Sequence, residues 1–212
     1  MSDCEDERRA MVAEQLAARG IVDERVLEAM GRVPREVFVD PRDRRRAYRD
    51  MPLRIGFGQT ISQPYMVAII CQVADVKDGD RVLDIGTGSG YQAAVLAEMG
   101  TSVHTVERIP ELAERARSRL AEAGYDRVDV SVGDGSLGRP EHGPYDAIVV
   151  AAAAPAMPES LYGELRPRGR LVVPVGGAEG QRLEVIVRSS EGPAVVRSVP
   201  CRFVPLVGAE GF

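Results

Sequence analysis

The sequence predicts an α/β fold, a doubly wound and mostly parallel β-sheet that follows an N-terminal helical portion. From residue 81 onward, short apolar runs of strand length alternate with segments of helical length. A glycine-rich turn follows the first of these apolar runs and leads directly into a helix. Right-handed crossovers place the carboxyl ends of parallel strands along one edge of the sheet, and ligands bind at that edge in such folds.

Start and stop residues bound the expected elements. Asp23 is a favourable N-cap residue, and Gly20, Gly31 and Gly124 each follow a helical pattern. The expected helices cover residues 11–19, 23–30, 65–74, 91–98, 111–123 and 158–165. The expected strands cover residues 82–85, 102–106, 128–132, 147–150, 171–174 and 183–187. An arginine-rich run at residues 42–49 is most simply a solvated helix face, although a patch for an acidic partner fits the same composition.

The length and composition indicate a single domain. The 212 residues suffice for one continuous core, and 44% hydrophobic with 28% charged residues is ordinary for a globular protein. We expect residues 1–10 to be frayed, residues 11–75 to form the helical portion, and residues 76–212 to form the sheet and a C-terminal segment near the site. The formal net charge of −5 disfavours a polyanionic partner such as nucleic acid.

The composition also disfavours membrane, secreted and metal-dependent classes. The sequence has no apolar run of about 18 residues, and its first residues lack the apolar core of a secretory signal. Cys4, Cys71 and Cys201 are too few and too scattered for a disulfide framework. Adding His104 and His142 gives no recognisable metal-ligand spacing. We therefore expect a cytoplasmic protein with reduced thiols and no metal.

The glycine-rich turn at residues 84–90, DIGTGSG, is the first candidate binding site. Gly86, Gly88 and Gly90 permit a tight turn and a close approach of the backbone to a ligand, with Thr87 between them. The spacing is G-x-G-x-G, not the G-x-G-x-x-G of dinucleotide folds, and the acidic Asp84 comes just before it. These two features favour S-adenosylmethionine, which has no phosphate and carries a cationic amino group. A nicotinamide-dependent dehydrogenase is the alternative that they disfavour.

Acidic residues at the ends of the next two strands extend this site. Glu107, followed by Arg108, lies about 20 residues past the glycines, where an acidic side chain accepts hydrogen bonds from ribose hydroxyls. Asp134 and Gly135 close the third strand, where an adenine amino group could be recognised. Turn formation is the simpler alternative for Asp134. We expect these residues to bind the cofactor together with the glycine loop.

Taken together, these motifs resemble the class I S-adenosylmethionine-dependent methyltransferases, which have a Rossmann-like fold. Further segments are similar to the protein-L-isoaspartate (D-aspartate) O-methyltransferase family, and the resemblance extends over residues 11–207. The segments that carry it are residues 33–39, 58–68, 83–92, 133–135, 145–148 and 202–207. The block at residues 59–68, QTISQPYMVA, is the most specific of them, because generic methyltransferases lack it. Ser136 is a small departure, since bacterial members often carry an aromatic residue there.

The resemblance implies an activity and assigns roles to residues. It implies that Ser62 is the active-site residue, that Gln59, Thr60 and Ile61 approach the cofactor and substrate, and that residues 202–206 lie near the mouth of the pocket. The implied reaction is methylation of the free α-carboxyl group of L-isoaspartyl residues in damaged proteins and peptides, which starts repair through a succinimide. We expect the enzyme to act as a monomer, without a metal.

Three alternatives remain open on the sequence alone. Ser62 precedes Gln63 and Pro64 and could simply cap the helix that follows. The same chemistry could serve a dedicated O-methyltransferase that modifies one aspartate of a biosynthetic peptide. The chain could also bind S-adenosylmethionine without catalysis, although the complete block around Ser62 disfavours this.

Overall fold

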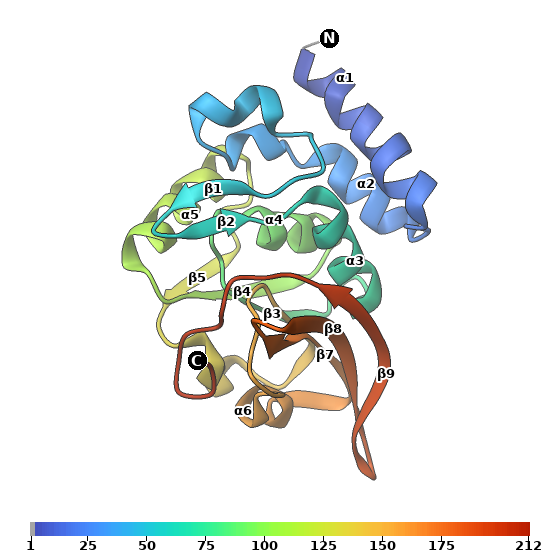
Figure 1. Ribbon diagram of the computed structural model, residues 1–212, viewed down its shortest axis with the longest axis vertical. Coiled ribbons are helices and arrows are strands. Elements are labelled where there is room, and N and C mark those ends of the chain that lie inside the picture. The colour runs from blue at the N-terminus through green and yellow to red at the C-terminus, as the bar shows by residue number, and fades with distance from the viewer. Residues whose placement is uncertain (1–2) are drawn as a thin grey trace.

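The computed structural model describes residues 3–212, and a seven-stranded sheet forms its centre. The strand order is β5-β4-β3-β6-β7-β8-β9, and the five strands from β5 to β7 are parallel. The last two pair antiparallel, β7 with β8 and β8 with β9. The strands are β3 (Arg81–Ile85), β4 (Ser102–Glu107), β5 (Asp129–Val132), β6 (Tyr145–Val150), β7 (Leu165–Gly177), β8 (Gly180–Ser189) and β9 (Gly192–Cys201). The predicted mostly parallel α/β fold is thus confirmed (Figure 1).

Successive side chains of the strands pack alternately into two separate hydrophobic cores, one on each face of the sheet. Val82 and Ala147 belong to the larger core, which also includes residues of α3 (Pro64–Ala74), α4 (Tyr91–Glu98) and α5 (Pro110–Glu122). Leu83 and Ile148, the next residues along the same strands, belong to the second core with α6 (Glu159–Gly163) and the C-terminal segment. This alternation follows from the two-residue period of a strand that is buried on both faces.

The N-terminal portion begins with a helix where the sequence predicts fraying. Helix α1 (Asp3–Ala10) continues through a π-helical turn (Met11–Leu16) and a 3-10 turn (Ala17–Arg19), and it ends at Gly20 with a left-handed φ of 91°. Met11 and Leu16 are buried in the larger core, which explains why this segment is ordered. The expectation for residues 1–2 lies outside the described residues.

The second helix confirms the predicted cap and extends beyond the predicted end. Asp23 accepts a hydrogen bond of 2.9 Å from the Arg25 backbone N–H at the start of α2 (Glu24–Arg32). The helix includes Gly31, because Val33 and not the glycine leaves the helical conformation. The arginine-rich run forms an exposed 3-10 helix (Pro41–Arg46), which leaves its solvated-face interpretation in place.

Two features of the sheet structure are absent from the sequence prediction. One is a small antiparallel hairpin of β1 (Leu53–Gly56) and β2 (Gln59–Ile61), which packs over the glycine-rich loop. The other is the edge strand β9, which carries a bulge at Val196, between the pairs Val185–Arg197 and Ile186–Val195. After β9 the chain crosses back beneath the β1–β2 hairpin (Figure 1). This crossing brings C-terminal residues to the same sheet edge as the glycine loop.

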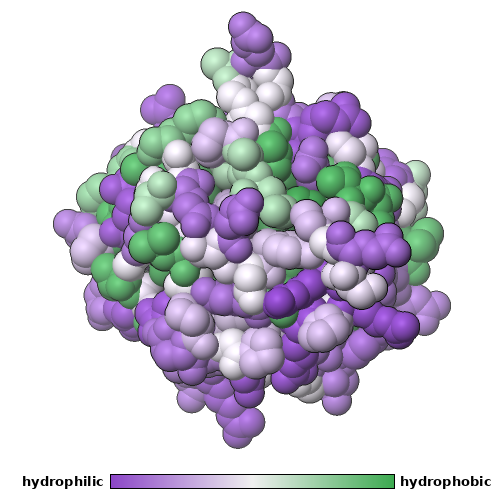
Figure 2. Space-filling model, turned by 90° about the horizontal axis from the view of Figure 1, so that it is seen from below, coloured by the Kyte–Doolittle hydropathy of each residue, from purple (hydrophilic) through white to green (hydrophobic). Residues whose placement is uncertain are grey.

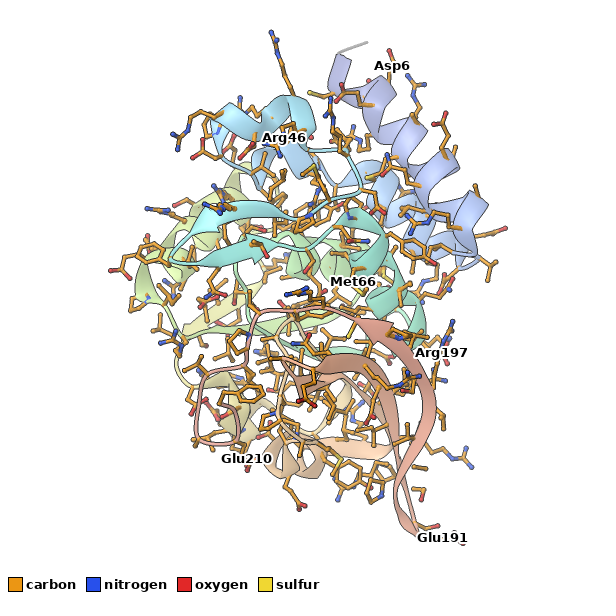
Figure 3. The ribbon with its side chains drawn as sticks, viewed as in Figure 1. Asp6, Arg46, Met66, Glu191, Arg197 and Glu210 are labelled. Atoms are coloured by element: carbon orange, nitrogen blue, oxygen red, sulfur yellow. The ribbon has the colours of Figure 1, made fainter. Side chains whose placement is uncertain are left out.

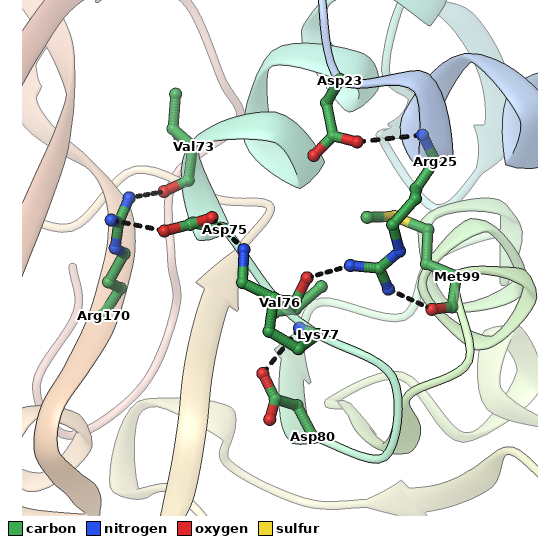
Figure 4. Close-up of polar contacts among 9 residues, drawn as sticks. All are labelled: Asp23, Arg25, Val73, Asp75, Val76, Lys77, Asp80, Met99 and Arg170. Carbon is green, nitrogen blue, oxygen red and sulfur yellow. Dashed lines mark hydrogen bonds and ion pairs between the residues drawn. The ribbon is translucent and has the colours of Figure 1, made fainter.

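Arginine side chains tie the N-terminal helices to the sheet (Figure 4). Arg25 of α2 donates to the backbone carbonyl groups of Val76 and Met99, which follow α3 and α4. Arg170 of β7 donates 2.9 Å to the Val73 carbonyl group and pairs at 2.7 Å with Asp75. These contacts satisfy carbonyl groups that helix ends leave free, and they fix the helical portion relative to the sheet.

The surface seen from below carries mainly hydrophilic residues, with hydrophobic residues in separate small groups (Figure 2). Val195 and Val196 of β9 are among the exposed hydrophobic residues. Within residues 3–212, no helix is both long and apolar enough to cross a membrane.

Candidate active site

The glycine-rich loop connects β3 to α4 at the carboxyl edge of the sheet. Gly86, Gly88 and Gly90 have φ values of 90°, 55° and 91°, which L-residues with side chains rarely adopt. The Gly86 N–H donates 2.9 Å to the carbonyl group of Val106 in β4, so the neighbouring strand fixes the start of the loop. A Cβ atom on Gly88 would lie 3.3 Å from the side chain of Ile55 in the β1–β2 hairpin. Glycine at these positions therefore keeps open a space beside the loop backbone, which we call the cradle.

Glu107 ends β4 beside this loop and binds its backbone. One carboxylate oxygen accepts a 2.8 Å hydrogen bond from the Gly88 N–H, and the other accepts 2.9 Å from the Ile109 N–H. Each oxygen has a second lone pair that can accept from a ligand hydroxyl group. Glu107 is buried and lines the cavity together with Arg108. Its position fits the ribose-binding role that the sequence predicts.

Asp84 does not line the cavity, although the sequence predicts direct cofactor contact. Its side chain is fully buried beneath the loop and accepts 2.8 Å hydrogen bonds from the Gln92 amide and the Thr105 hydroxyl. Thr105 in turn lies 2.7 Å from the hydroxyl of Thr87, which does line the cavity. Burial raises the pKa of Asp84 to about 6, against the opposing hydrogen bonds from Gln92 and Thr105. Asp84 thus supports the loop from below and reaches the cavity only through Thr105 and Thr87.

Asp134 and Gly90 also lie outside the cavity lining, whereas Gly135 is part of it. One oxygen of Asp134 accepts 2.7 Å from the Ser136 hydroxyl, and the other accepts 2.7 Å from the Ala209 N–H. Asp134 also caps the short 3-10 turn through the Ser136 N–H at 2.9 Å. The turn-forming interpretation accounts for these contacts, and they join the end of β5 to the C-terminal segment.

The segment at residues 59–62 forms the opposite wall of the cavity. Gln59, Thr60 and Ile61 form β2, and Ser62 follows at the end of the hairpin. All four residues line the cavity, which is compatible with the roles that the family resemblance implies for them. Ser62 does not cap α3, because the Tyr65 N–H at the start of that helix donates 3.0 Å to Asp50. The capping alternative for Ser62 is therefore wrong, and its hydroxyl is left to the cavity.

A fully buried arginine fixes the backbone at Ser62. Arg35 donates through Nη2 to the Ser62 carbonyl group at 2.8 Å and through Nε to the Ala47 carbonyl group at 2.7 Å. Its guanidinium carbon lies 4.7 Å from the centre of the Tyr91 ring, within the range of a cation–π contact. Burial lowers the pKa of Arg35 to about 10, so the side chain stays charged at neutral pH. The sequence analysis gave no role to Arg35, and only its place in the 33–39 block could have indicated one.

Residues 204–207 close the cavity from the C-terminal side. The Ala153 N–H donates 2.8 Å to the Val204 carbonyl group, and the Leu206 N–H donates 2.7 Å to the Ala153 carbonyl group. These bonds attach the C-terminal segment to the turn after β6, where Ala151 and Ala152 also line the cavity. The sequence prediction that this segment lies at the pocket is consistent with the structure. The contribution of the alanine turn was not predicted.

A second cavity of about 410 Å³ adjoins the first and shares Thr60, Ser62, Ala151 and Val204 with it. Its remaining lining residues are Pro52, Gln63, Met66, Arg202 and Phe203. Figure 3 labels Met66 on α3, close to the C-terminal segment as it crosses the molecule. Ser62 therefore stands where the two cavities meet.

Comparisons with known proteins agree with this geometry. A family model described as protein-L-isoaspartate(D-aspartate) O-methyltransferase (PCMT) matches residues 6–211. A protein-L-isoaspartate O-methyltransferase of Methanoculleus marisnigri is 51% identical over 209 residues, which are 99% of this chain and 95% of the relative. Protein-L-isoaspartate O-methyltransferase 2 of Marinobacter nauticus is 54% identical over 212 residues, with 99% and 97% coverage.

The fold is similar to that of a solved Plasmodium falciparum structure, described as a protein-L-isoaspartate O-methyltransferase in complex with S-adenosyl-L-homocysteine. The TM-score is 0.81 at 28% identity, and the match covers 94% of this chain and 98% of the other. A second solved protein-L-isoaspartate O-methyltransferase gives a TM-score of 0.85 at 28% identity, covering 96% of this chain and 67% of the other. The family model matches residues 6–211, and the two relatives are 51% and 54% identical to this chain. This chain therefore belongs to the protein-L-isoaspartate(D-aspartate) O-methyltransferase family.

Proposed function

We propose that this enzyme transfers the methyl group of S-adenosylmethionine to the free α-carboxyl group of L-isoaspartyl residues in proteins and peptides. The observation that carries this proposal is the position of Ser62, which lines both cavities. We call the cavity at the glycine loop the cofactor cavity and the second one the acceptor cavity. The family match and the relatives of the same name support the choice of acceptor.

The cofactor cavity fits S-adenosylmethionine. The glycine loop leaves room at Gly88 for a ligand, and Glu107 offers a lone pair on each oxygen to ribose hydroxyl groups. Bound S-adenosylmethionine supplies a methyl group on a cationic sulfur atom. The cofactor contacts of Gln59, Thr60, Ile61, Gly86, Thr87, Arg108 and Gly135 are part of this proposal, because all of them line the cavity.

The acceptor cavity fits a carboxylate. Arg202 is the charged residue among its described lining residues, which include neither aspartate nor glutamate. A carboxyl group has a reference pKa of about 4, so the acceptor is already ionised and nucleophilic at neutral pH and needs no strong base. The chain's task is then to hold one carboxylate oxygen, for which the Ser62 hydroxyl is suited, and to align the other with the methyl group. Such alignment in a site that excludes water accounts for catalysis without a metal.

The methyl ester explains how the reaction leads to repair. A methyl ester carries a far better leaving group than a carboxylate does, so the neighbouring backbone nitrogen can attack the ester carbonyl, release methanol and close a succinimide without further help. Hydrolysis of the succinimide converts part of the isoaspartyl residues to normal aspartyl residues.

This one chain lines both cavities. We therefore propose that the enzyme acts as a monomer, which sedimentation at working concentration would test.

The decisive experiment compares two peptides of one sequence that differ only in an isoaspartyl or an aspartyl linkage. The free carboxylate of the isoaspartyl residue lies one carbon closer to the main chain than that of aspartate. A placement error of about 1 Å can cost about a hundredfold in rate when catalysis depends on geometry. We therefore expect the isoaspartyl peptide to gain a methyl group, detected by mass, at least about a hundredfold more efficiently.

The Ser62→Ala enzyme is the matched control for this comparison, since it should retain the cofactor cavity while methyl transfer falls by about tenfold to several hundredfold. Equal rates on both peptides would contradict the proposal. Methylation of one particular aspartyl peptide, with none of the isoaspartyl form, would instead support the alternative of a dedicated peptide-modifying enzyme.

A further inference from the structure

The two histidines of the chain, His104 and His142, lie against each other in the fold. Their ring centres are 4.4 Å apart, and the ring planes make an angle of 28°. Nδ1 of His104 also lies 3.2 Å from Oδ2 of Asp129. One nitrogen of each histidine and one oxygen of Asp129 lie within 4.8 Å of one another. Three groups with the chemistry of metal ligands thus converge from distant parts of the sequence.

The sheet register and a short turn produce this convergence. His104 of β4 is directly paired with Asp129, the first residue of β5. His142 ends a 3-10 turn (Pro140–His142) that leads toward β6. Arg81 of β3 donates 2.9 Å to the carbonyl group of His142, and Tyr145 of β6 presents its ring edge-on to His104 at 6.3 Å. The backbone at His142 and the ring of His104 are therefore held in place from neighbouring strands.

We propose that His104, Asp129 and His142 form a binding site for a divalent transition-metal ion, with Zn²⁺ as the best match. Imidazole nitrogen suits zinc, nickel and copper, whereas calcium and magnesium prefer sites made of oxygen atoms. Zinc binds histidine nitrogen and carboxylate oxygen at about 2.0–2.2 Å, so two ligand atoms of a tetrahedral site lie about 3.3 Å apart. The 3.2 Å between His104 and Asp129 matches this spacing. Because an imidazole nitrogen binds a metal in the plane of its own ring, the stacked rings must turn so that both nitrogens point at one ion.

The exposure of the site allows an ion to enter and water to complete the coordination. The side chain of Asp129 is 49% exposed, and that of His104 is 19% exposed. Three protein ligands leave a fourth tetrahedral position for a water molecule or an outside group. The Arg81 guanidinium group opposes a nearby cation, while the Asp129 carboxylate and the net charge of −5 favour one.

The proposed metal site is separate from methyl transfer. None of its three residues lines the cofactor cavity or the acceptor cavity. His104 lies three residues before Glu107 on β4, which corresponds to roughly 10 Å along the strand. An ion bound there would join β4, β5 and the turn before β6, and its expected effect is on stability. The proposed methyl transfer therefore still needs no metal.

The test is a titration of the purified, chelator-stripped protein with zinc chloride, followed by calorimetry. We expect one Zn²⁺ per chain and a rise in melting temperature with zinc concentration. His104→Asn and His142→Asn should each weaken zinc binding at least about tenfold, since even outer-shell changes can cost that much. Methylation of the isoaspartyl peptide should be unchanged in both variants, which separates this site from the proposed function.

Two controls make the outcome specific. Asp126→Asn removes a nearby exposed carboxylate and should leave zinc binding intact, whereas Asp129→Asn should weaken it. Cys4→Ser and Cys201→Ser test the two partly exposed cysteines, because thiolate is also a common zinc ligand, and both variants should bind zinc as the wild type does. With only two histidines, ¹⁵N-histidine spectra provide a readout that needs no variant, because both rings should shift together on addition of Zn²⁺. Unshifted rings, or binding that survives both histidine variants, would overturn the proposal.

Discussion

Nη2 of the buried Arg35 lies 2.8 Å from the backbone carbonyl oxygen of Ser62. An interior arginine thus holds the main chain of the residue at which the two cavities meet. We predict that Arg35→Lys lowers kcat at least about tenfold, because a lysine cannot bridge the two carbonyl groups and the serine would lose its alignment. Affinity for S-adenosylhomocysteine should stay within about twofold, because Arg35 does not line the cofactor cavity.

Arg119→Lys is the matched control for Arg35. Arg119 is partly buried and, like Arg35, donates to backbone carbonyl groups, but these are those of Phe38 and Val39 and not of residues 59–62. Both variants should lose stability, since unpaired buried carbonyl groups cost about 1–3 kcal/mol. Only the Arg35 variant should lose turnover. Equal kcat losses in the two variants would reduce Arg35 to a general packing role.

Ser62→Ala should lower turnover by about tenfold to several hundredfold while the melting temperature stays near that of the wild type. The structural reason is that Asp50, and not Ser62, accepts from the first free N–H of α3. Asp50→Ala should show the opposite pattern in stability, with a loss of about 1 kcal/mol from the missing cap. Paired kinetics and thermal unfolding of the two variants provide the measurement. A lowered melting temperature with normal kinetics for Ser62→Ala would return this serine to a structural role.

Gly88→Val should weaken S-adenosylhomocysteine binding at least tenfold, equivalent to about 1.4 kcal/mol. The φ of 55° strains a branched side chain, and the new Cβ atom would lie 3.3 Å from Ile55. Gly124→Val is a suitable control, because Gly124 has a φ of 85° with nothing within 4 Å of its Cβ position. It should show a comparable backbone penalty and normal affinity by calorimetry. Unchanged affinity in a folded Gly88 variant would mean that the loop does not form the cradle.

Glu107→Ala should weaken cofactor binding by about 1.5–3 kcal/mol, the usual cost of losing hydrogen bonds to a charged group. The variant would remove the hydrogen-bond acceptor of the Gly88 and Ile109 backbone N–H groups. It would also remove the acceptor for the ribose hydroxyl groups of the cofactor. The maximal rate at saturating cofactor should change far less than the affinity. Initial rates over a range of S-adenosylmethionine concentrations separate the two effects. A collapse of the maximal rate at normal affinity would point to a role in the chemical step.

The raised pKa of Asp84 predicts a specific pH dependence of stability. Its folded value of about 6 lies above the ordinary value of 3.8, so the folded state binds the proton more tightly than the unfolded state. The associated stability is complete below pH 3.8 and is lost as the pH rises to about 6, a change of about 3 kcal/mol at 1.36 kcal/mol per pH unit.

Asp84→Asn isolates this dependence, because it keeps the shape and removes the titration. Denaturant unfolding of both proteins at several pH values should show wild type losing stability relative to the variant between pH 3.8 and 6. A constant difference across this range would contradict the assigned pKa. The amide cannot accept from both Gln92 and Thr105 as the carboxylate does, so the absolute stabilities are expected to differ at every pH.

The sequence predicted well those parts of the fold whose signals are local. The strand, glycine turn and helix around Gly86 follow from a short apolar run, residues with special backbone angles and a helical pattern. The cap at Asp23 is equally local, since the side chain bonds to an N–H two residues away. Glu107 was predicted to bind the ribose, and it lies in the cavity because the length of one strand–helix–strand unit fixes its place beside the loop.

Other features depend on contacts between distant residues, which spacing does not reveal. Asp84 is on the predicted strand, but the direction of its side chain depends on Gln92 and Thr105, which are supplied by α4 and β4. Asp134 bonds to Ala209, far along the chain. The hairpin at Gln59–Ile61 has only three residues in its second strand, too short for periodicity to predict. The contact between His104 and His142 arises from the fold of the whole sheet.

The edge strand β9 has a consequence for an enzyme whose clients are damaged proteins. Such clients expose extended segments, and an open sheet edge is a template on which extended segments can pair and aggregate. Pro193 and Pro200 near the two ends of β9 lack the N–H that such pairing needs, Arg197 adds charge, and the bulge in β9 at Val196 disturbs the regular twist. These features limit strand pairing at the open edge of the sheet, while Val195 and Val196 remain exposed there.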